Sequence, residues 1–157
     1  MKVSQLLKEE LIVPNLTLTE KDAVLEYLVK IANPAIKENS SVEPQIILQA
    51  LRDRETMMST GIGNGIAIPH AKVEGVNNLI ILFARSQTGV NFQALDEAPV
   101  NLIFLLIGPV TNSSDYMKLL ATISALLKKK KVRTSLMQAQ NKLDIIAAIK
   151  TGEASKE

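Results

Sequence analysis

The sequence predicts an α/β fold in which a mixed β-sheet is flanked by helices on both faces. Two continuous apolar runs, at 79–84 and 100–107, have the length of strands that are covered on both sides. Segments with apolar residues at helical spacing precede and follow these runs, so helices and strands interleave. The 157 residues contain neither an internal repeat nor a long linker. We therefore expect residues 1–157 to form a single domain with a polar tail over 151–157.

The first part of the chain predicts a short strand and two helices. Residues 11–13 form a brief apolar strand. Thr19 and Asp22 have the spacing of a capping box, and the helix behind them is expected to end at the Asn-Pro pair at 33–34. A second helix opens at the Glu-Pro pair at 43–44, because proline is tolerated in the first helical turn. The apolar faces of the two helices consist of Val24, Leu25, Leu28, Ile31 and Ala32, and of Ile46, Ile47, Ala50 and Leu51.

The middle of the chain predicts the strands of the sheet. Glycines at 61–65 interrupt regular structure, and a short strand follows at 66–68. The two apolar runs are the long strands. Between them we expect a turn at 87–89 and a loop at 96–99.

Three helices are predicted after the second apolar run. Residues 111–114 offer N-caps for the first helix, whose apolar positions run over 117–127. A second helix covers 132–139, and a third covers 141–149 with Asn and Asp three residues apart at its start. The four lysines at 128–131 are interpreted as a solvated helix end that the helix dipole favours, with a docking patch for an acidic partner as the alternative.

Composition excludes several classes of function. A hydrophobic share of 46% and a charged share of 22% are typical of soluble globular proteins. A net charge of +2, two tyrosines and three phenylalanines argue against nucleic-acid binding. With no cysteine and one histidine, we expect neither a disulfide nor a metal site, and we expect no cofactor. No segment approaches the roughly 20 apolar residues of a membrane span and the start has no apolar leader, so we expect a cytoplasmic protein without membrane insertion.

The single histidine, His70, is the first candidate for chemistry. It follows a short apolar run, and Arg54 lies upstream. An imidazole is a nucleophile at neutral pH, because its unperturbed pKa of about 6.5 leaves much of it uncharged. Taken alone, one histidine is more often a surface residue or a hydrogen-bonded core residue. A serine-hydrolase elbow is absent, and zinc usually takes several His or Cys ligands.

The segment before His70 offers ligands for an anion. Glycines permit close backbone approach and expose N–H groups, and hydroxyls add donors, although a flexible helix-to-strand connection explains the same glycines. The Arg54 guanidinium suits a bidentate grip on phosphate, or is simply a cation at a helix end. The candidate phosphate ligands besides Arg54 are Ser59, Thr60, Gly61, Gly63 and Gly65.

Together these residues resemble a known family. The stretch Ser-Thr-Gly-Ile-Gly-x-Gly-Ile-Ala-Ile-Pro-His at 59–70, with Leu51-x-x-Arg54-Glu55 before it, is similar to the signature of the type-2 EIIA domain. This domain is the fructose/mannitol class of the bacterial phosphoenolpyruvate:sugar phosphotransferase system, and the class includes nitrogen-regulatory EIIA proteins. The resemblance covers nearly the whole chain.

The resemblance implies a mannitol EIIA-like fold and a phosphohistidine chemistry. The histidine matching His70 accepts a phosphoryl group from the phosphohistidine of HPr or of its nitrogen-branch relative. It then passes the group to a cysteine of an EIIB domain, or holds it as a regulatory mark read by a target protein. The arginine matching Arg54 steadies the phosphoryl group, and no metal is needed.

One position departs from the family pattern. The family usually has a second active-site histidine in an H-L-x-x-L-A pattern, and this chain has Tyr116 there. Tyrosine can donate a hydrogen bond to a phosphoryl oxygen but cannot offer a positive charge. A regulatory EIIA is favoured over a sugar-specific one, and a binding module that keeps the fold without phosphorylation is the alternative.

Overall fold

The computed structural model describes residues 1–111 and 113–155 of the chain. Within them a mixed six-stranded sheet has the strand order β1-β5-β6-β3-β2, and β4 pairs with β6. The strands are β1 (Ile12–Val13), β2 (Gly61–Gly63), β3 (Ile66–Ala67), β4 (His70–Lys72), β5 (Ile80–Val90) and β6 (Val100–Gly108). The helices are α1 (Val3–Leu6), the 3-10 turn η1 (Glu9–Leu11), α2 (Lys21–Asn39), α3 (Pro44–Met57), α4 (Ser113–Lys128), α5 (Lys130–Gln138) and α6 (Lys142–Ala154).

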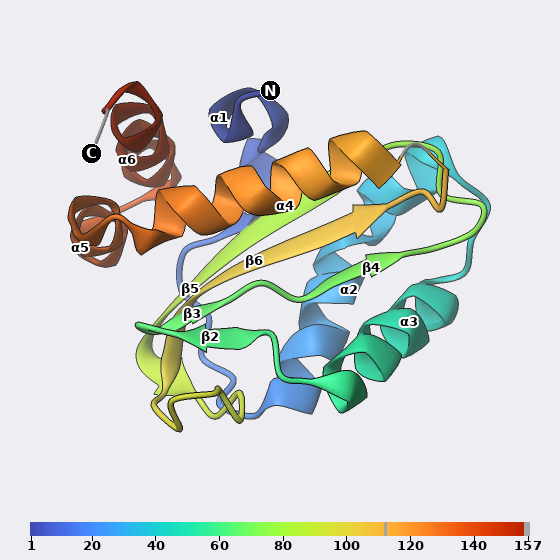
Figure 1. The fold of residues 1–157 in the computed structure, drawn as a ribbon, viewed down its shortest axis with the longest axis horizontal. Coiled ribbons are helices and arrows are strands. Elements are labelled where there is room, and N and C mark those ends of the chain that lie inside the picture. Colours follow the sequence, from blue (N-terminus) through green and yellow to red (C-terminus); the bar gives the residue numbers. More distant parts are fainter. Residues whose placement is uncertain (112, 156–157) are drawn as a thin grey trace.

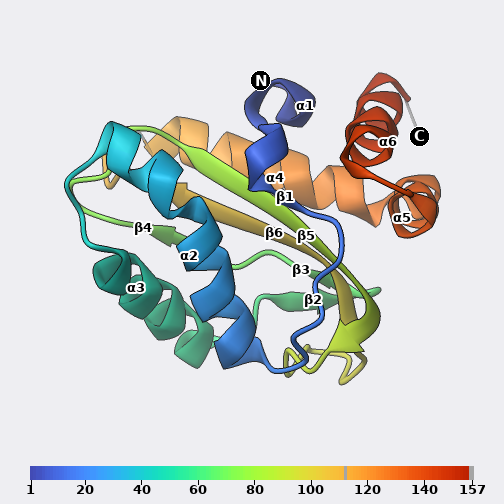
Figure 2. The ribbon, with the colours of Figure 1, turned by 180° about the vertical axis from the view of Figure 1, so that it is seen from behind.

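Helices cover both faces of the sheet, which confirms the predicted α/β architecture. Helix α4 crosses one face, with α1, α5 and α6 gathered at one end of the molecule (Figure 1). Helices α2 and α3 cover the opposite face (Figure 2). The long strands β5 and β6 are antiparallel, and the rings of Phe83 and Phe104 lie across from each other with centroids 4.9 Å apart. The central pair is therefore buried on both sides, as its continuous apolar sequence requires.

Strand β5 is longer than expected. The turn predicted at 87–89 lies inside it, so that prediction was wrong. The register against β6 shifts between Arg85 and Val90, and the ladder resumes where Val90 pairs with Val100. The Gly89 N–H donates to Ser86 Oγ (2.9 Å) within the irregularity. The polar Gln-Thr-Gly segment thus forms a bulge in a strand rather than a reversal of the chain.

Helix α2 differs from its prediction at both ends. It continues past the Asn-Pro pair to Asn39, with Pro34 inside the helix. Proline removes one backbone hydrogen bond, but the burial of Ile36 (0% exposed) two residues later holds the extra turn against the core. The predicted capping box is also absent, because the N-cap is Glu20 and makes no side-chain cap bond. Asp22 instead accepts two N–H groups from Arg52 on α3, at 2.7 and 3.1 Å.

Helix α3 begins with proline in its first turn, as predicted. Its buried face is shifted by one position from the expected one. Ile46 is 57% exposed, and Ile47, Leu48 and Leu51 are buried. The N-cap of α6 is confirmed, since Asn141 accepts the Asp144 N–H at 2.9 Å. Asn112, one of the expected N-caps of α4, lies outside the described residues.

Helix α6 extends to Ala154, so the tail expected to fray from residue 151 is helical over its first part. Gly152 allows this packing. A Cβ there would lie 2.5 Å from Val132 Cγ2 and 2.9 Å from Leu126 Cδ1, so the helix backbone sits directly against α4 and α5. Lys129 Nζ donates to the carbonyls of Gly152 (2.7 Å) and Ser155 (3.0 Å). One of the four consecutive lysines therefore neutralises the end of a neighbouring helix.

Arg85 is a buried cation that connects the segment after β1 with the end of α5. Its side chain is on β5, and the residue is 3% exposed. The guanidinium donates to the Pro14 carbonyl (3.0 Å) and to the Leu136 carbonyl (3.0 Å). It also donates to the carbonyls of Met137 and Ala139 at the end of α5. Partial negative charge at a helix C-terminus thus takes the place of a carboxylate partner.

Candidate functional site

His70 begins β4, and the short gap between β3 and β4, at Ile68 and Pro69, sets the direction of its ring. Strands β3 and β4 pair with β6 in one continuous parallel register, from Ile66 opposite Leu102 to His70 opposite Leu106. Between them the Ile68 N–H donates to Thr60 (3.0 Å), and the Ile68 carbonyl lies 2.7 Å from His70 Nδ1. A carbonyl only accepts, so Nδ1 carries the proton. The lone pair of the neutral ring is therefore on Nε2.

The surroundings of His70 favour the neutral ring. Partial burial lowers the pKa of His70 below its ordinary 6.5 because it penalises the charged form. The bond to the Ile68 carbonyl raises the pKa, the Arg54 charge lowers it, and the Glu55 charge raises it, each by less than burial does. The net direction is downward, so Nε2 is an available nucleophile at neutral pH.

Arg54 stands in the last turn of α3, and its positive charge acts on the histidine site. Arg54 Nη1 donates to the Met58 carbonyl just beyond the helix (2.8 Å), which directs the side chain. Its positive charge lowers the pKa of both His70 and Tyr116. Arg54 on α3 is thus near enough for its charge to act on His70 on β4 and on Tyr116 on α4, and its role at a phosphoryl site stays a prediction.

Tyr116 lies on α4 with its ring close to the imidazole. The two ring centroids are 6.2 Å apart, at an interplanar angle of 57°. Gly108 provides the space, because a Cβ there would lie 2.6 Å from Tyr116 Cδ2. Burial raises the pKa of Tyr116 to about 12, although the Arg54 charge opposes this. The phenol is therefore a protonated hydrogen-bond donor at any physiological pH.

The hydroxyls of Ser59 and Thr60 make hydrogen bonds to groups of the protein itself. Ser59 Oγ donates to the Phe92 carbonyl (3.1 Å) and accepts the Gly61 N–H (3.1 Å). The Thr60 hydroxyl and N–H both donate to the Glu55 carboxylate. In this arrangement both hydroxyl protons point into the protein, and the phosphate-binding role expected for these two residues stays a prediction.

Glu55 and Lys21 form a largely buried ion pair next to Thr60, and neither residue was a site candidate from the sequence. Glu55 Oε2 lies 3.0 Å from Lys21 Nζ, with side chains 5% and 15% exposed. The pair holds Thr60 in place, and Thr60 in turn accepts the Ile68 N–H through its carbonyl. Glu55 thus supports the backbone that orients His70.

The glycines form a β-hairpin rather than an open loop, which corrects the break expected over 61–65. Strands β2 and β3 pair antiparallel, and Asn64 (φ 58°) with Gly65 (φ 75°) has the two left-handed positions of a type I′ turn. Ile66, the residue after this turn, pairs with β6 four residues before His70 does, roughly 13 Å along the strand. Gly61 permits the close approach of Ala94, whose Cβ would lie 2.8 Å from an added one. Phosphate binding by Gly61, Gly63 and Gly65 stays a prediction beside these structural roles.

Large apolar side chains are exposed beside Arg54 and Tyr116 in the chain and on the segment around the glycine hairpin. Met57 (80% exposed) and Met58 (59%) follow Arg54, and Met117 (54%) follows Tyr116. Ile62 on β2 is 40% exposed, and Leu95, whose N–H donates to the Gly61 carbonyl, is 59% exposed. Flexible methionines are well suited to contact partners of different shape.

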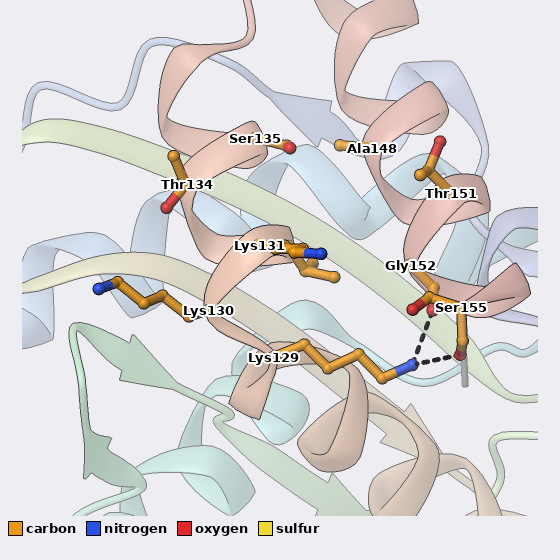
Figure 3. A pocket seen from close by; sticks show the side chains of 10 residues that line it. Lys129, Lys130, Lys131, Thr134, Ser135, Ala148, Thr151, Gly152 and Ser155 are labelled. Carbon is orange, nitrogen blue, oxygen red and sulfur yellow. Dashed lines mark hydrogen bonds between the residues drawn. The ribbon is translucent and has the colours of Figure 1, made fainter. Parts of the chain in front are cut away.

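A large cavity lies away from these residues. It occupies about 740 Å³ between α5 and α6, and none of the site candidates lines it. Figure 3 shows the Lys129 side chain extending to the carbonyls of Gly152 and Ser155 at the end of α6, while Lys130 points away from them. Among the described residues no group of three His, Asp or Glu side chains can hold a metal ion, and no described helix has the length and apolarity to cross a bilayer.

Comparisons with known proteins connect this geometry with one family. Residues 5–152 match the family model described as "Phosphoenolpyruvate-dependent sugar phosphotransferase system, EIIA 2". The chain is 36% identical over 149 residues to the fructose-specific EIIABC component of Bacillus subtilis, covering 95% of this chain but 23% of that protein. It is 40% identical over 119 residues to a nitrogen regulatory protein of Pseudomonas aeruginosa, covering 76% of this chain and 75% of that one.

A solved structure agrees with these matches. The crystal structure of the nitrogen regulatory protein IIA-Ntr from Neisseria meningitidis superimposes with a TM-score of 0.86 at 28% identity, over 94% of this chain and 98% of that one. The arrangement of helices and strands is therefore the one found in an EIIA protein.

Proposed function

Because the chain belongs to the EIIA 2 family of the phosphoenolpyruvate-dependent sugar phosphotransferase system, we propose that it is a phosphocarrier with His70 as its phosphoryl acceptor. Membership of the family supports a carrier or regulatory role in that system. The observation that carries the finer proposal is the Nδ1–H bond to the Ile68 carbonyl, which leaves Nε2 of a neutral ring as the nucleophile.

The proposed step is a direct transfer between two imidazoles. The lone pair of His70 Nε2 forms a bond to the phosphorus of a phosphohistidine on HPr or its nitrogen-branch relative. The P–N bond of the donor breaks, and its electron pair returns to the donor ring. The His70 proton stays on Nδ1, where the Ile68 carbonyl stabilises the positive charge that the ring acquires. Because bonds of the same kind form and break, catalysis consists mainly of positioning and charge stabilisation.

Arg54 and Tyr116 are the proposed contacts of the transferred group. The guanidinium offers two parallel donors for phosphoryl oxygens, and the phenol offers one more because its pKa of about 12 keeps it protonated. The exposed apolar residues next to both, Met58 and Met117 among them, are proposed as contacts of the partner proteins. No membrane or nucleic acid takes part, and the carrier works in the cytoplasm.

Two destinations of the phosphoryl group fit the family. One is a cysteine of an EIIB domain in sugar uptake, and the other is retention on His70 as a mark read by a regulatory target. The Pseudomonas nitrogen regulatory protein is 40% identical to this chain, against 36% for the fructose EIIABC protein, and the structure that superimposes with a TM-score of 0.86 is also a nitrogen regulatory protein. We therefore favour the nitrogen-regulatory role over a sugar-specific one.

The proposal is tested by reconstituting the phosphorylation chain. The protein is incubated with phosphoenolpyruvate, Enzyme I and an HPr-type carrier, and its intact mass is followed. We expect an increase of one phosphoryl group that is lost in acid and that fragmentation locates on His70. A wild-type chain that stays unmodified with both HPr and its nitrogen-branch relative would instead make it a binding module that keeps the EIIA fold.

The rate of phosphoryl acceptance should depend on pH in a predictable direction. The pKa of His70 lies below 6.5, so the ring is neutral and reactive at pH 7 and above. The rate is expected to be level there and to decline only as the pH falls through that lowered pKa. An NMR titration of the imidazole nitrogens measures the same pKa and the tautomer. A pKa above 7, or a proton on Nε2 of the neutral ring, would contradict this.

Arg54→Lys should slow phosphoryl acceptance by about 10²-fold, because an ammonium replaces a fork of two donors at the transferring group. The matched control is Arg52→Lys on the same helix, where the guanidinium pairs with the exposed Asp22. That control should retain the wild-type rate. Single-turnover transfer from the phosphorylated carrier measures both. Equal rates for the two variants would remove Arg54 from the phosphoryl site.

A further inference from the structure

Lys72 stands on the same strand as His70, two residues later. Alternate residues of a strand point to the same side of the sheet, so the two side chains share the side that faces α4. Lys72 Nζ lies 5.3 Å from the centroid of the Tyr116 ring and 3.2 Å from Ser113 Oγ. The N-terminal end of α4 lies beside the ends of β4 and β6 (Figure 1), which brings both contacts to the ammonium.

The Tyr116 ring is the link between this ammonium and the imidazole. Its centroid is 6.2 Å from that of His70 and 5.3 Å from Lys72 Nζ. Gly108 holds the ring in that place, since any Cβ there would collide with it. Arg54 acts on the same two rings, His70 and Tyr116, from the end of α3. The site thus has one cation from α3 and a second from β4.

The two present contacts of Lys72 are weak. One is the weak attraction of an exposed ammonium to an aromatic face, and in the other the Ser113 hydroxyl is a neutral acceptor. A phosphoryl dianion offers charge-assisted hydrogen bonds that are about twice as strong as neutral ones. The lysine side chain is a flexible four-carbon stem, so the ammonium can change position at little cost in free energy.

We propose that Lys72 is the second cation of the phosphoryl site: it rests on Tyr116 and Ser113 while His70 is unmodified, and it binds phosphoryl oxygens once His70 carries the group. This rests on the proposed function of His70. The exchange releases Ser113 in the first turn of α4. Phosphorylation of His70 is thereby converted into a change at the exposed start of that helix, where a partner can read it.

The first test measures how much Lys72 stabilises the phosphorylated form. Lys72→Gln is expected to lower the equilibrium ratio of phosphorylated to free protein about five- to tenfold, because it removes the charge and keeps a polar stem. Lys72→Arg should stay within about twofold of the wild type. The matched control is Lys118→Gln, an exposed lysine on α4 that should leave the ratio unchanged. The ratio is read by intact mass against a carrier of fixed phosphorylation.

The second test follows the ammonium itself. Because the Lys72 ammonium lies over the Tyr116 ring, the protons of the adjoining ε-methylene should resonate upfield, and the Lys72→Arg spectrum assigns them by their absence. Phosphorylation of the wild type should move them downfield. The phosphoryl donor is the carrier or phosphoramidate, in which the P–N bond breaks with its electron pair leaving on ammonia while His70 Nε2 forms the new bond.

The outcomes separate this proposal from the proposed function. A wild type that is phosphorylated on His70 with unmoved Lys72 resonances, and a Lys72→Gln ratio equal to the wild-type ratio, would overturn the role of Lys72 alone. A wild type that phosphoramidate modifies but the carrier does not would overturn the carrier function, and the Lys72 shift would still be measured. A protein that neither donor phosphorylates on His70 overturns both.

Discussion

Replacing His70 by glutamine is expected to abolish phosphorylation while leaving the fold in place. The amide nitrogen of glutamine has its lone pair delocalised into the carbonyl, so it is no nucleophile. The side chain is nevertheless polar and of similar size, and it can donate to the Ile68 carbonyl as Nδ1 does. We expect a free energy of unfolding within about 1 kcal/mol of the wild type, the range of substitutions that leave the core unchanged.

Intact mass after incubation with the phosphorylated carrier measures the loss, and circular dichroism with thermal unfolding checks the fold. His70 is the only histidine of the chain, so a phosphorylated His70→Gln variant would have its group on an oxygen or a lysine nitrogen. The pH stability of the modification would then identify which, and the phosphohistidine mechanism would be wrong.

Replacing Arg85 by leucine is expected to lower the free energy of unfolding by about 3–4 kcal/mol. The change removes the donor of four carbonyl groups, those of Pro14, Leu136, Met137 and Ala139. Buried carbonyls without donors keep the full cost of their desolvation. Arg85→Lys should recover little, because one ammonium does not reach carbonyls on both sides of the planar guanidinium.

Urea denaturation measures this loss, with Arg133→Gln as the matched control. Arg133 also donates to carbonyls at the end of a helix, those of Leu127 and Lys128, but it does so closer to the surface. Its loss should cost about 1 kcal/mol. An Arg85→Leu variant as stable as this control would show that α5 needs no cation at its end. At temperatures where the Arg85→Leu variant is folded, the extent to which its His70 becomes phosphorylated should equal that of the wild type.

The layers of the fold were predictable because they follow from periodicity. The apolar strands and the helices on both sides are encoded locally, as is the Asn141 cap. The missed features depend on distant contacts. Pro34 stays inside α2 because Ile36 is buried, and residues 87–89 stay in β5 because Val90 pairs again with β6. Local signals for a helix end and for a turn were outweighed by tertiary packing.

The candidate site was predictable only in part. The rings of His70 and Tyr116 lie near each other and the Arg54 charge acts on both, although the family signature implied a histidine where Tyr116 stands. The Asn-Gly pair at 64–65 is typical of a β-hairpin turn, but the three spaced glycines had been interpreted as a break in regular structure. Lys72 had a signal in the sequence, since it stands two residues after His70 on a strand. Lys21 and Arg85 had none, because their partners lie 34 or more positions away.

The unbroken register across Ile68 and Pro69 has a consequence for how this site can vary. His70 resumes the same pairing with β6 that Ile66 began, so its side is set by counting residues along the sheet. Adding or deleting a single residue in this short segment would turn the imidazole toward α2 and α3, away from Tyr116. The segment can change its composition, but its length is as essential to the chemistry as the nucleophile.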